Sequence, residues 1–200
     1  MSRNPRETRG KLVKTAYEQM HKHGFQGMRV DQVLKQTGLK KGGFYHHFSS
    51  KTELGYAVVE EEIRALLEAI WINPINSMNN PVTDIPLMIE TLDDRTTKLM
   101  REHGCPLNNL ALEMSNLDEG FRKRIDENFN LWIDALTKKL DEAKNKKYIR
   151  QDIDSEVVAR FVIAVIEGCI SITKVEKTKQ QSAVGVSQIS DYLKSLELKG

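Results

Sequence analysis

The residues best suited to chemistry form one short cluster near the N-terminus of this sequence. From Gly38 to Phe48 the chain reads GLKKGGFYHHF, so lysine, tyrosine and histidine side chains are interleaved with apolar ones. On the outside of a short helix, such side chains suit hydrogen bonds to phosphate oxygens and to base edges. Leu39, Phe44 and Phe48 would hold the helix on its neighbours. The segment from Thr37 to Phe48 is therefore expected to contact a nucleic acid.

The distribution of charge favours the same kind of partner. Residues 1–60 contain 11 Lys and Arg against 5 Asp and Glu, whereas residues 61–200 contain 19 against 23. A basic block on a slightly acidic remainder suggests that the first third of the chain meets a polyanion. Chance clustering of surface lysines is the alternative that charge alone leaves open.

Three short helices are expected to position the cluster. Asn followed by Pro at residues 4–5 predicts the start of the first helix, and Gly24 predicts its end. A second helix is expected over residues 30–37 and a third over residues 41–48, with a tight turn at Gly38 between them. Two short helices joined in this way, inside a basic three-helix unit, are typical of a helix-turn-helix.

Helical periodicity continues through the rest of the chain, and no stretch reads as a long strand. Ser50 and Glu53 form a capping box that opens a helix ending near residue 72. Residues 73–86 are rich in Asn and Pro and are expected to form a loop. Further helices are expected over residues 87–102, 107–115, 118–145, 154–175 and 184–196. The sequence therefore predicts an all-α protein.

Several classes of function are not expected. No stretch approaches the ~18 apolar residues of a membrane span, and the first residues show no secretory signal. The two cysteines, Cys105 and Cys169, suit a reduced cytoplasmic protein rather than a disulfide scaffold. No glycine-rich phosphate loop, nucleophile elbow or pair of histidines at metal-ligand spacing is present. Neither an enzyme nor a metal or cofactor site is expected, and acidic runs such as residues 60–62 are read as solvated.

The N-terminal third resembles the DNA-binding signature of the TetR family of repressors. The matching positions are Thr8-Arg9, Ala16, Gly24-Phe25, Gly38-Leu39, Lys41-Gly42, Phe44-Tyr45-His46-His47-Phe48, Ser50-Lys51 and Leu54. The remainder is similar to the family in arrangement only. The resemblance implies a DNA-binding domain over residues 1–50 and a helical effector-binding and dimerisation domain over residues 51–200. It also implies a homodimer that binds a palindromic double-stranded operator and leaves it when a small-molecule effector binds.

The resemblance also implies roles for single residues. Tyr45 and Lys51 match positions that usually contact phosphates, and Lys41 and His46 match positions that face the major groove. The full expected DNA-binding set is Arg29, Lys40, Lys41, Gly42, Gly43, Tyr45, His46, His47 and Lys51. The family often has Ser or Thr where Lys40 and Gly43 stand, so the operator sequence is not implied.

An apolar effector pocket is expected among the helices of the second domain, although ordinary core is the alternative for each of its residues. The candidates are Trp71, Met88, Met100, Cys105, Met114, Phe129 and Trp132. The helix expected over residues 154–175 is apolar on more than one face, which favours a dimer interface.

Cys105 supports a second hypothesis. It precedes Pro106 at a helix break and resembles a Gly-Cys turn found in a subset of TetR regulators, some of which respond to electrophiles or oxidants. The thiol would then be the trigger. Simple packing of a small side chain at a tight turn is the alternative, and Cys169 is expected to lie in the core or in a dimer interface.

Overall fold

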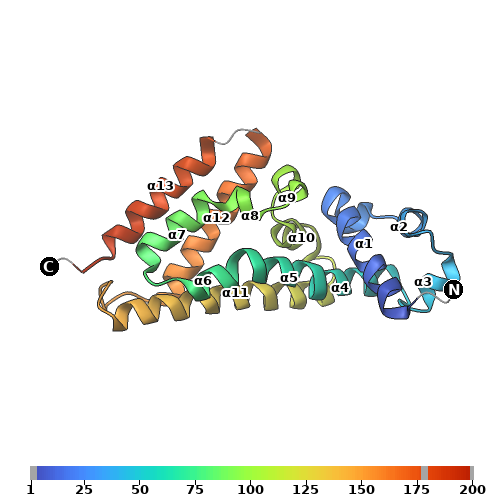
Figure 1. Cartoon of the computed structure of the whole chain (residues 1–200), viewed down its shortest axis with the longest axis horizontal. Coiled ribbons are helices and arrows are strands. Elements are labelled where there is room, and N and C mark those ends of the chain that lie inside the picture. Colours follow the sequence, from blue (N-terminus) through green and yellow to red (C-terminus); the bar gives the residue numbers. More distant parts are fainter. Residues whose placement is uncertain (1–3, 177–179, 199–200) are drawn as a thin grey trace. The chain divides into compact units, whose positions relative to one another are not determined.

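The computed structural model of the protein describes residues 4–176 and 180–198 (Figure 1). The described residues are helical apart from connecting turns and a single isolated antiparallel bridge between Ile149 and Glu197. The all-α prediction is therefore confirmed. The chain divides into two compact units, which we call the head unit (Met1–Leu66 with Pro106–Asn128) and the bundle unit (Leu67–Cys105 with Phe129–Gly200). None of the described helices is long and apolar enough to cross a membrane.

The head unit begins with α1 (Pro5–Gly27), whose N-terminus is capped as the sequence predicts. The Asn4 side chain accepts a hydrogen bond from the Arg6 N–H, and Pro5 occupies the first turn. Gly24 has φ +74°, so regular helical geometry stops there even though helical hydrogen bonding resumes up to residue 27. A glycine tolerates this left-handed backbone without the steric cost that other residues carry.

Two short helices follow α1 in the head unit. They are α2 (Val30–Thr37) and α3 (Lys41–Tyr45), the second of which ends three residues earlier than predicted. Gly38 lies between them at φ +66° and caps α2 in the left-handed conformation, as expected of a glycine in a helix-turn-helix. The unit is completed by α10 (Pro106–Met114) and by the first part of α11 (Glu119–Asn145).

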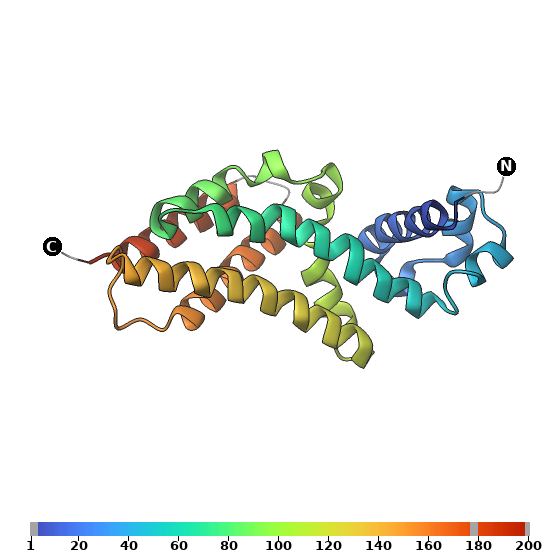
Figure 2. The ribbon, with the colours of Figure 1, turned by 60° about the horizontal axis from the view of Figure 1, so that its bottom comes forward.

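A continuous helical run begins at Lys51, where Ser50 caps the helix as predicted, although Glu53 binds the residue before the cap and not the cap itself. The Ser50 hydroxyl accepts from the Glu53 N–H, and the Glu53 carboxylate accepts from the Ser49 N–H. The run comprises α4 (Lys51–Ala57), η1 (Val58–Ile63), α5 (Arg64–Leu67), η2 (Glu68–Ile72) and α6 (Asn73–Ser77). Figure 2 shows these segments following one another without a loop. The two η segments are π-helical, with hydrogen bonds that reach one residue further than in an α-helix.

The prediction of a loop over residues 73–86 is wrong. Pro74 lies in α6, inside the continuous helical run, and only three residues separate the end of α6 from the start of α7 (Pro81–Glu90). Asn80 caps α7 by accepting from the Val82 N–H, while the Asp84 carboxylate accepts from the backbone N–H of residues 79 and 80. Asn80 and Pro81 therefore start a helix, and Pro74 and Pro86 lie within helices, so the stretch does not form a long loop.

The single helix predicted over residues 87–102 is interrupted twice. α7 ends at Glu90, α8 (Leu92–Arg95) follows, and α9 (Lys98–His103) begins after an extended residue at Thr96. The Thr97 hydroxyl accepts from the Met100 N–H and so caps α9. Threonine hydroxyls compete with the backbone for hydrogen bonds in this way, which disfavours a continuous helix.

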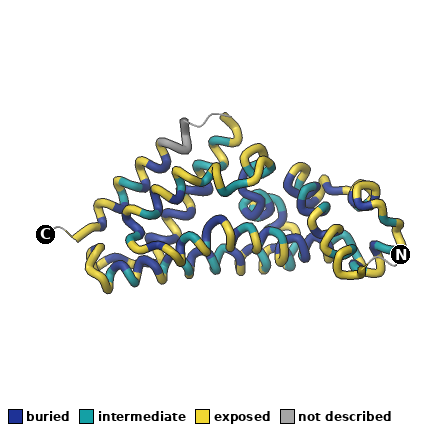
Figure 3. Tube along the Cα trace, viewed as in Figure 1, coloured by how far each residue is buried: buried dark blue, intermediate teal, exposed yellow. Residues whose placement is uncertain are grey.

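The bundle unit is built from α7, α12 (Ser155–Glu176), α13 (Gln180–Ser195) and the second part of α11. α13 packs against both α7 and α12, and Figure 1 shows the three together. Buried and exposed positions alternate along these helices, as expected of amphipathic helices (Figure 3). Trp71 and Trp132 stack in the core with ring centroids 4.6 Å apart. The helices predicted over residues 107–115, 118–145, 154–175 and 184–196 are confirmed to within a few residues at each end.

Gly55 marks the tightest packing in the head unit. A Cβ at this position would lie 2.6 Å from Phe121 and 2.7 Å from Phe25, two buried rings whose centroids are 4.6 Å apart. Neither ring can move away without disturbing the other. α4 therefore approaches α1 and α11 more closely than any larger residue would allow.

We expect the Gly55→Ala variant to lower the free energy of unfolding by about 1–3 kcal/mol, the usual cost of overpacking. Gly10→Ala is the matched control, because a Cβ there meets nothing within 4 Å on an exposed helix face. That variant should raise the stability by about 0.5–1 kcal/mol, the difference in helix propensity. Urea denaturation measures both, and equal stabilities for the two variants would contradict the close approach.

Candidate nucleic-acid interface

The recognition segment is held by the buried side of α3. Phe44 is 1 % exposed and Phe48 is 4 % exposed, while Leu39 is half-buried. The two phenyl rings lie 6.0 Å apart, and the Arg9 guanidinium of α1 lies 5.1 Å from the centre of the Phe48 ring. The turn before α3 is fixed by the Leu39 N–H, which donates to the Leu34 carbonyl at 3.1 Å. The apolar residues of the segment therefore anchor it on α1 and α2.

The outer side of the same segment is accessible to solvent. Tyr45 is 63 % exposed although its ring meets Phe44 edge to face at 5.2 Å. The other exposed members of the expected DNA-binding set are Arg29, Lys40, Lys41, Gly42 and His46, and the half-buried members are Gly43, His47 and Lys51. Lys41 pairs loosely with Asp31 at 3.8 Å, an exposed contact that stabilises little and leaves the ammonium group accessible.

The His47 imidazole offers hydrogen bonds more than charge. Its pKa is lowered from the ordinary value by burial, with smaller contributions from His46 and from the Arg9 guanidinium. A neutral imidazole both donates and accepts a hydrogen bond. The adjacent His46 ring, 5.1 Å away, is more exposed.

Lys51 is engaged within the head unit. Its ammonium group donates to the Gln26 carbonyl at 3.1 Å and lies 4.7 Å from the centre of the Phe25 ring. Burial lowers its pKa, and the Glu113 carboxylate opposes that shift. Lys51 thus ties the start of α4 to the end of α1, and its contact with a phosphate stays a prediction.

Sequence reasoning missed the residues that fix the end of α1. The Glu113 carboxylate of α10 accepts from the Phe25 N–H at 2.9 Å and from the Gln26 N–H at 2.8 Å. These backbone groups follow the kink at Gly24, where a Cβ would lie 2.8 Å from the same carboxylate. The partners are 87 and 88 residues apart in the sequence. No local signal could have indicated this pairing.

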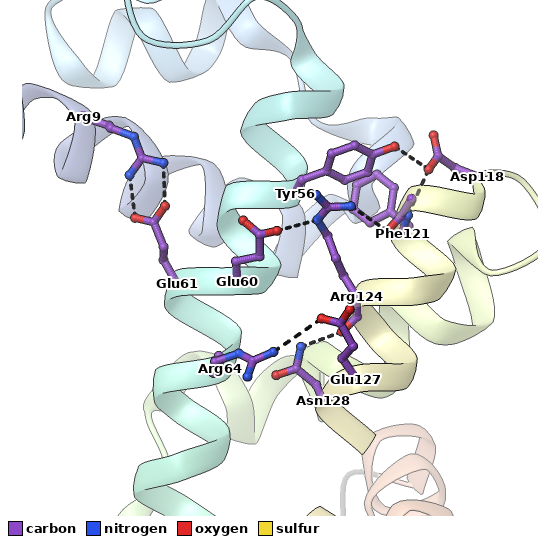
Figure 4. A network of polar contacts seen from close by, with 11 residues as sticks. Arg9, Tyr56, Glu60, Glu61, Arg64, Asp118, Phe121, Arg124, Glu127 and Asn128 are labelled. Atoms are coloured by element: carbon purple, nitrogen blue, oxygen red, sulfur yellow. Dashed lines mark hydrogen bonds and ion pairs between the residues drawn. The ribbon is translucent and has the colours of Figure 1, made fainter. Parts of the chain in front are cut away.

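A polar network joins the remaining helices of the head unit (Figure 4). Arg9 binds Glu61 through both terminal nitrogens, at 2.6 and 2.7 Å, and so ties α1 to η1. The neighbouring Glu60 accepts from Arg124 of α11 at 2.7 Å, and the Arg124 guanidinium also lies 4.0 Å from the centre of the Tyr56 ring. Two members of the acidic run that was expected to be solvated therefore connect helices.

The start of α11 is fixed by a second contact in the same network. The Tyr56 hydroxyl donates to Asp118 at 2.6 Å, and the same carboxylate accepts from the Phe121 N–H at 2.9 Å. These hydrogen bonds lower the pKa of Asp118 and raise that of Tyr56. The helices that carry the recognition segment are thus positioned by directional contacts as well as by apolar packing.

The expected effector-pocket residues divide between the two units. Trp71, Met88, Met100, Cys105, Phe129 and Trp132 belong to the bundle unit, whereas Met114 belongs to the head unit. The structure brings Trp71 and Trp132 into direct contact, and both side chains are buried. Met88 and Cys105 are also buried. Met100 and Phe129 are half-buried. Whether these residues receive an effector stays a prediction.

The turn that carries Cys105 packs on α12. A Cβ at Gly104 would lie 3.4 Å from Lys174 Cδ and 3.6 Å from Ile170. Cys105 is 8 % exposed, and its thiol lies beside the carboxyl group of Glu167, a residue of α12. Cys169 is half-buried, with its sulfur against Gly185 of α13, and burial raises the pKa of its thiol.

Comparison with known proteins gives consistent results for both parts of the chain. Residues 12–58 match the family described as bacterial regulatory proteins, tetR family, and residues 87–189 match the tetracyclin repressor-like C-terminal domain. The HTH-type transcriptional repressor DhaR of Mycobacterium sp. strain GP1 is 28 % identical over 187 residues, which cover 90 % of this chain and 88 % of that protein. An HTH-type transcriptional regulator in the lacX 3′ region of Lactococcus lactis is 27 % identical over 175 residues, 86 % of each chain.

The fold is shared with a TetR-family regulator from Cytophaga hutchinsonii. That crystal structure superposes with a TM-score of 0.88 at 22 % identity, over 100 % of this chain and 99 % of the other. A basic helix-turn-helix on a helical second part, with transcription regulators as relatives, defines a DNA-binding transcription regulator. Because the C-terminal family match alone spans just over half of the chain, the protein belongs to the TetR family.

Gly42 offers a test of how closely the backbone of α3 must approach DNA. A Cβ at this exposed position would meet nothing within 4 Å, so internal packing does not require glycine there. Gly42→Ala should therefore raise the free energy of unfolding by about 0.5–1 kcal/mol. We expect the same variant to bind DNA about tenfold more weakly, equivalent to ~1.4 kcal/mol. Chemical denaturation and fluorescence anisotropy measure the two effects, and unchanged DNA affinity would remove the reason for glycine at this position.

Proposed function

We propose that the protein is a ligand-responsive transcriptional repressor that acts as a homodimer on a palindromic operator. The observation that carries the proposal is the two-sided recognition segment, with Phe44 and Phe48 buried and Lys41, Tyr45 and His46 accessible. In this proposal residues 1–50 bind double-stranded DNA, and residues 51–200 bind a small effector and dimerise. Each protomer would place α3 in a major groove, with half-sites about 34–36 Å apart. As a DNA-bound regulator of a bacterial type, it would act in the cytoplasm.

The surface of α12 supports the homodimer. Val157, Phe161, Ile172 and Val175 are exposed by 61, 46, 47 and 81 %, and Ala164 and Gly168 are exposed between them. These positions recur at helical spacing on one side of α12, while the other side packs in the core of the bundle unit. An apolar stripe of this kind is costly in water unless a partner covers it. A second copy of the chain is the partner that a palindromic operator requires.

The proposed response to an effector requires only that the effector bind two conformations of the protein with different affinities. A ligand that binds the DNA-incompetent conformation more tightly shifts the population toward it and releases the operator. α4 begins directly after the recognition segment, and Ser50 and Glu53 fix its first turn. A displacement of α4 would therefore reorient α3.

The thiol of Cys105 is not proposed as the trigger. Redox-sensing cysteines are solvent-accessible, whereas Cys105 is buried against α12. Packing at the turn after α9 accounts for a small side chain there. The expected DNA-binding set, including Arg29, Lys40 and Lys51, remains part of the proposal.

Tyr45→Ala tests the recognition segment directly. Because Tyr45 is largely exposed, the change should leave stability nearly unaltered and weaken operator binding by about 1–3 kcal/mol, the range for a lost DNA contact. The operator would first be recovered by genomic footprinting, and affinity would be measured at about 0.15 M salt. Tyr148→Ala, which removes an exposed tyrosine from the bundle unit, is the matched control. Equal affinities for the two variants would place DNA binding elsewhere.

Phe161→Asp tests the proposed dimer interface. A charge within the α12 stripe should raise the dimer dissociation constant about 30-fold or more, as expected for a hot-spot residue. Leu112→Asp is the control, because Leu112 is 80 % exposed on α10 and lies outside the stripe. Sedimentation equilibrium measures both variants. Dimerisation that survives Phe161→Asp but is lost in Leu112→Asp would move the interface to the head unit.

A further inference from the structure

Glu167 is a buried carboxyl group that neither the fold nor DNA binding explains. It lies on the packed side of α12, between Ile163 and Ile170, and its residue is only 6 % exposed. Within the described residues, neither of its two carboxyl oxygens has a hydrogen-bond partner of normal geometry. Buried polar side chains are nearly always hydrogen-bonded, because an unpaired one loses its hydration without compensation.

The surroundings of Glu167 do not compensate its charge. The Cys105 thiol lies beside the carboxyl group, but a thiol is only a weak hydrogen-bond donor. Burial raises the pKa of Glu167 to about 7, and the thiol opposes that shift. No cationic side chain of the described residues contributes to the shift. Among the described residues, the ionised carboxylate is therefore without a countercharge.

Packing alone would favour an apolar residue at this position. The neighbouring buried residues of α12 are aliphatic: Val158, Ala159, Val162, Ile163 and Ile166. A leucine or methionine would continue that row without a desolvation cost. Residues that lower the stability of the fold and have no structural partner are typical of binding sites, where function is retained although the ligand-free protein is less stable.

We propose that Glu167 is the recognition residue for the effector, and that the effector is an organic cation with N–H donors on an apolar body. The inference rests on the proposed function, since it assigns a ligand class to the effector-binding part of the chain. A cation supplies the countercharge that the protein does not, and two parallel N–H groups match the two carboxylate oxygens of Glu167. The aliphatic row around Glu167 suits the apolar body.

The test compares three small probes of nearly the same shape by calorimetry: benzamidine as the cation, benzamide as the neutral amide and benzoate as the anion. For molecules of this size a dissociation constant of about 1 mM is expected for the cation. Benzamidine should bind wild-type protein at least about tenfold more tightly than benzamide or benzoate, an advantage of ~1.4 kcal/mol. Equal binding of the three probes, or no binding of benzamidine up to about 10 mM, overturns the proposal.

Variants of Glu167 locate the interaction. Glu167→Gln keeps the shape of the side chain and should weaken benzamidine binding at least about tenfold while changing benzamide binding little. Glu156→Gln is the matched control, because Glu156 is an exposed glutamate of the same helix that pairs with Arg160. Benzamidine binding that is equally strong in wild type and Glu167→Gln overturns the proposal.

Glu167→Leu separates a binding role from a structural one. If the carboxyl serves a ligand, this variant should unfold at a temperature equal to or higher than that of the ligand-free wild type. A lower melting temperature for both Glu167→Leu and Glu167→Gln would show that the carboxyl supports the fold, and would overturn the proposal.

Operator binding measured on the same samples distinguishes this inference from the proposed function. Glu167→Gln that binds the operator normally and benzamidine as tightly as wild type refutes the inference and leaves the repressor proposal intact. Benzamidine binding that depends on Glu167 but leaves operator affinity unchanged supports the cation site. That second result would contradict ligand-controlled release of DNA.

Discussion

The recognition helix depends on the burial of two aromatic rings. α3 has only five residues, two of them glycines, and a helix of that length and composition is not stable by itself in water. It exists because Phe44 and Phe48 are buried, with Arg9 of α1 over the Phe48 ring, and because the Leu39 N–H holds the preceding turn on α2. That anchorage leaves Lys41, Tyr45 and His46 on the opposite side. The close approach at Gly55 and the Arg9–Glu61 pair in turn hold α1 against the helices that follow α3.

Local signals in the sequence predicted most of the fold. Caps at Asn4 and Ser50 and the left-handed glycine at position 38 depend on residues within one turn, so a reader of the sequence can recognise them. The same signature recurs further along the chain. Asn80 and Pro81 repeat the signature of residues 4–5, yet the density of Asn and Pro over residues 73–86 indicated a loop. The structure shows that position within the cluster matters more than composition, because Asn caps a helix and Pro begins one.

The contacts that set the geometry of the site could not be predicted, because they join residues far apart in the sequence. Glu113 closes the end of α1 from 87 and 88 residues away, and Arg124 reaches Glu60 across 64 residues. Glutamates on amphipathic helices are ordinarily solvated, so their types gave no indication of these pairings. The burial of Glu167 could not be predicted from the sequence either. Its helix was expected to be buried on more than one face, but only tertiary structure shows that this carboxyl, rather than its neighbours, is enclosed.

The π-helical segments η1 and η2 have a consequence for how relatives of this chain are compared. Each π-type turn holds one residue more than the α-turn it replaces, so side chains beyond it are rotated by about 100° around the helix axis. A relative that lacks either turn can keep the same fold only if its sequence is one residue shorter there. When the sequence of a relative is aligned with this one, a single-residue gap between residues 58 and 72 should therefore be read as the loss of a π-type turn. Such a gap changes the direction of the side chains that follow in the run from Lys51 to Ser77, and it is not a change in loop length.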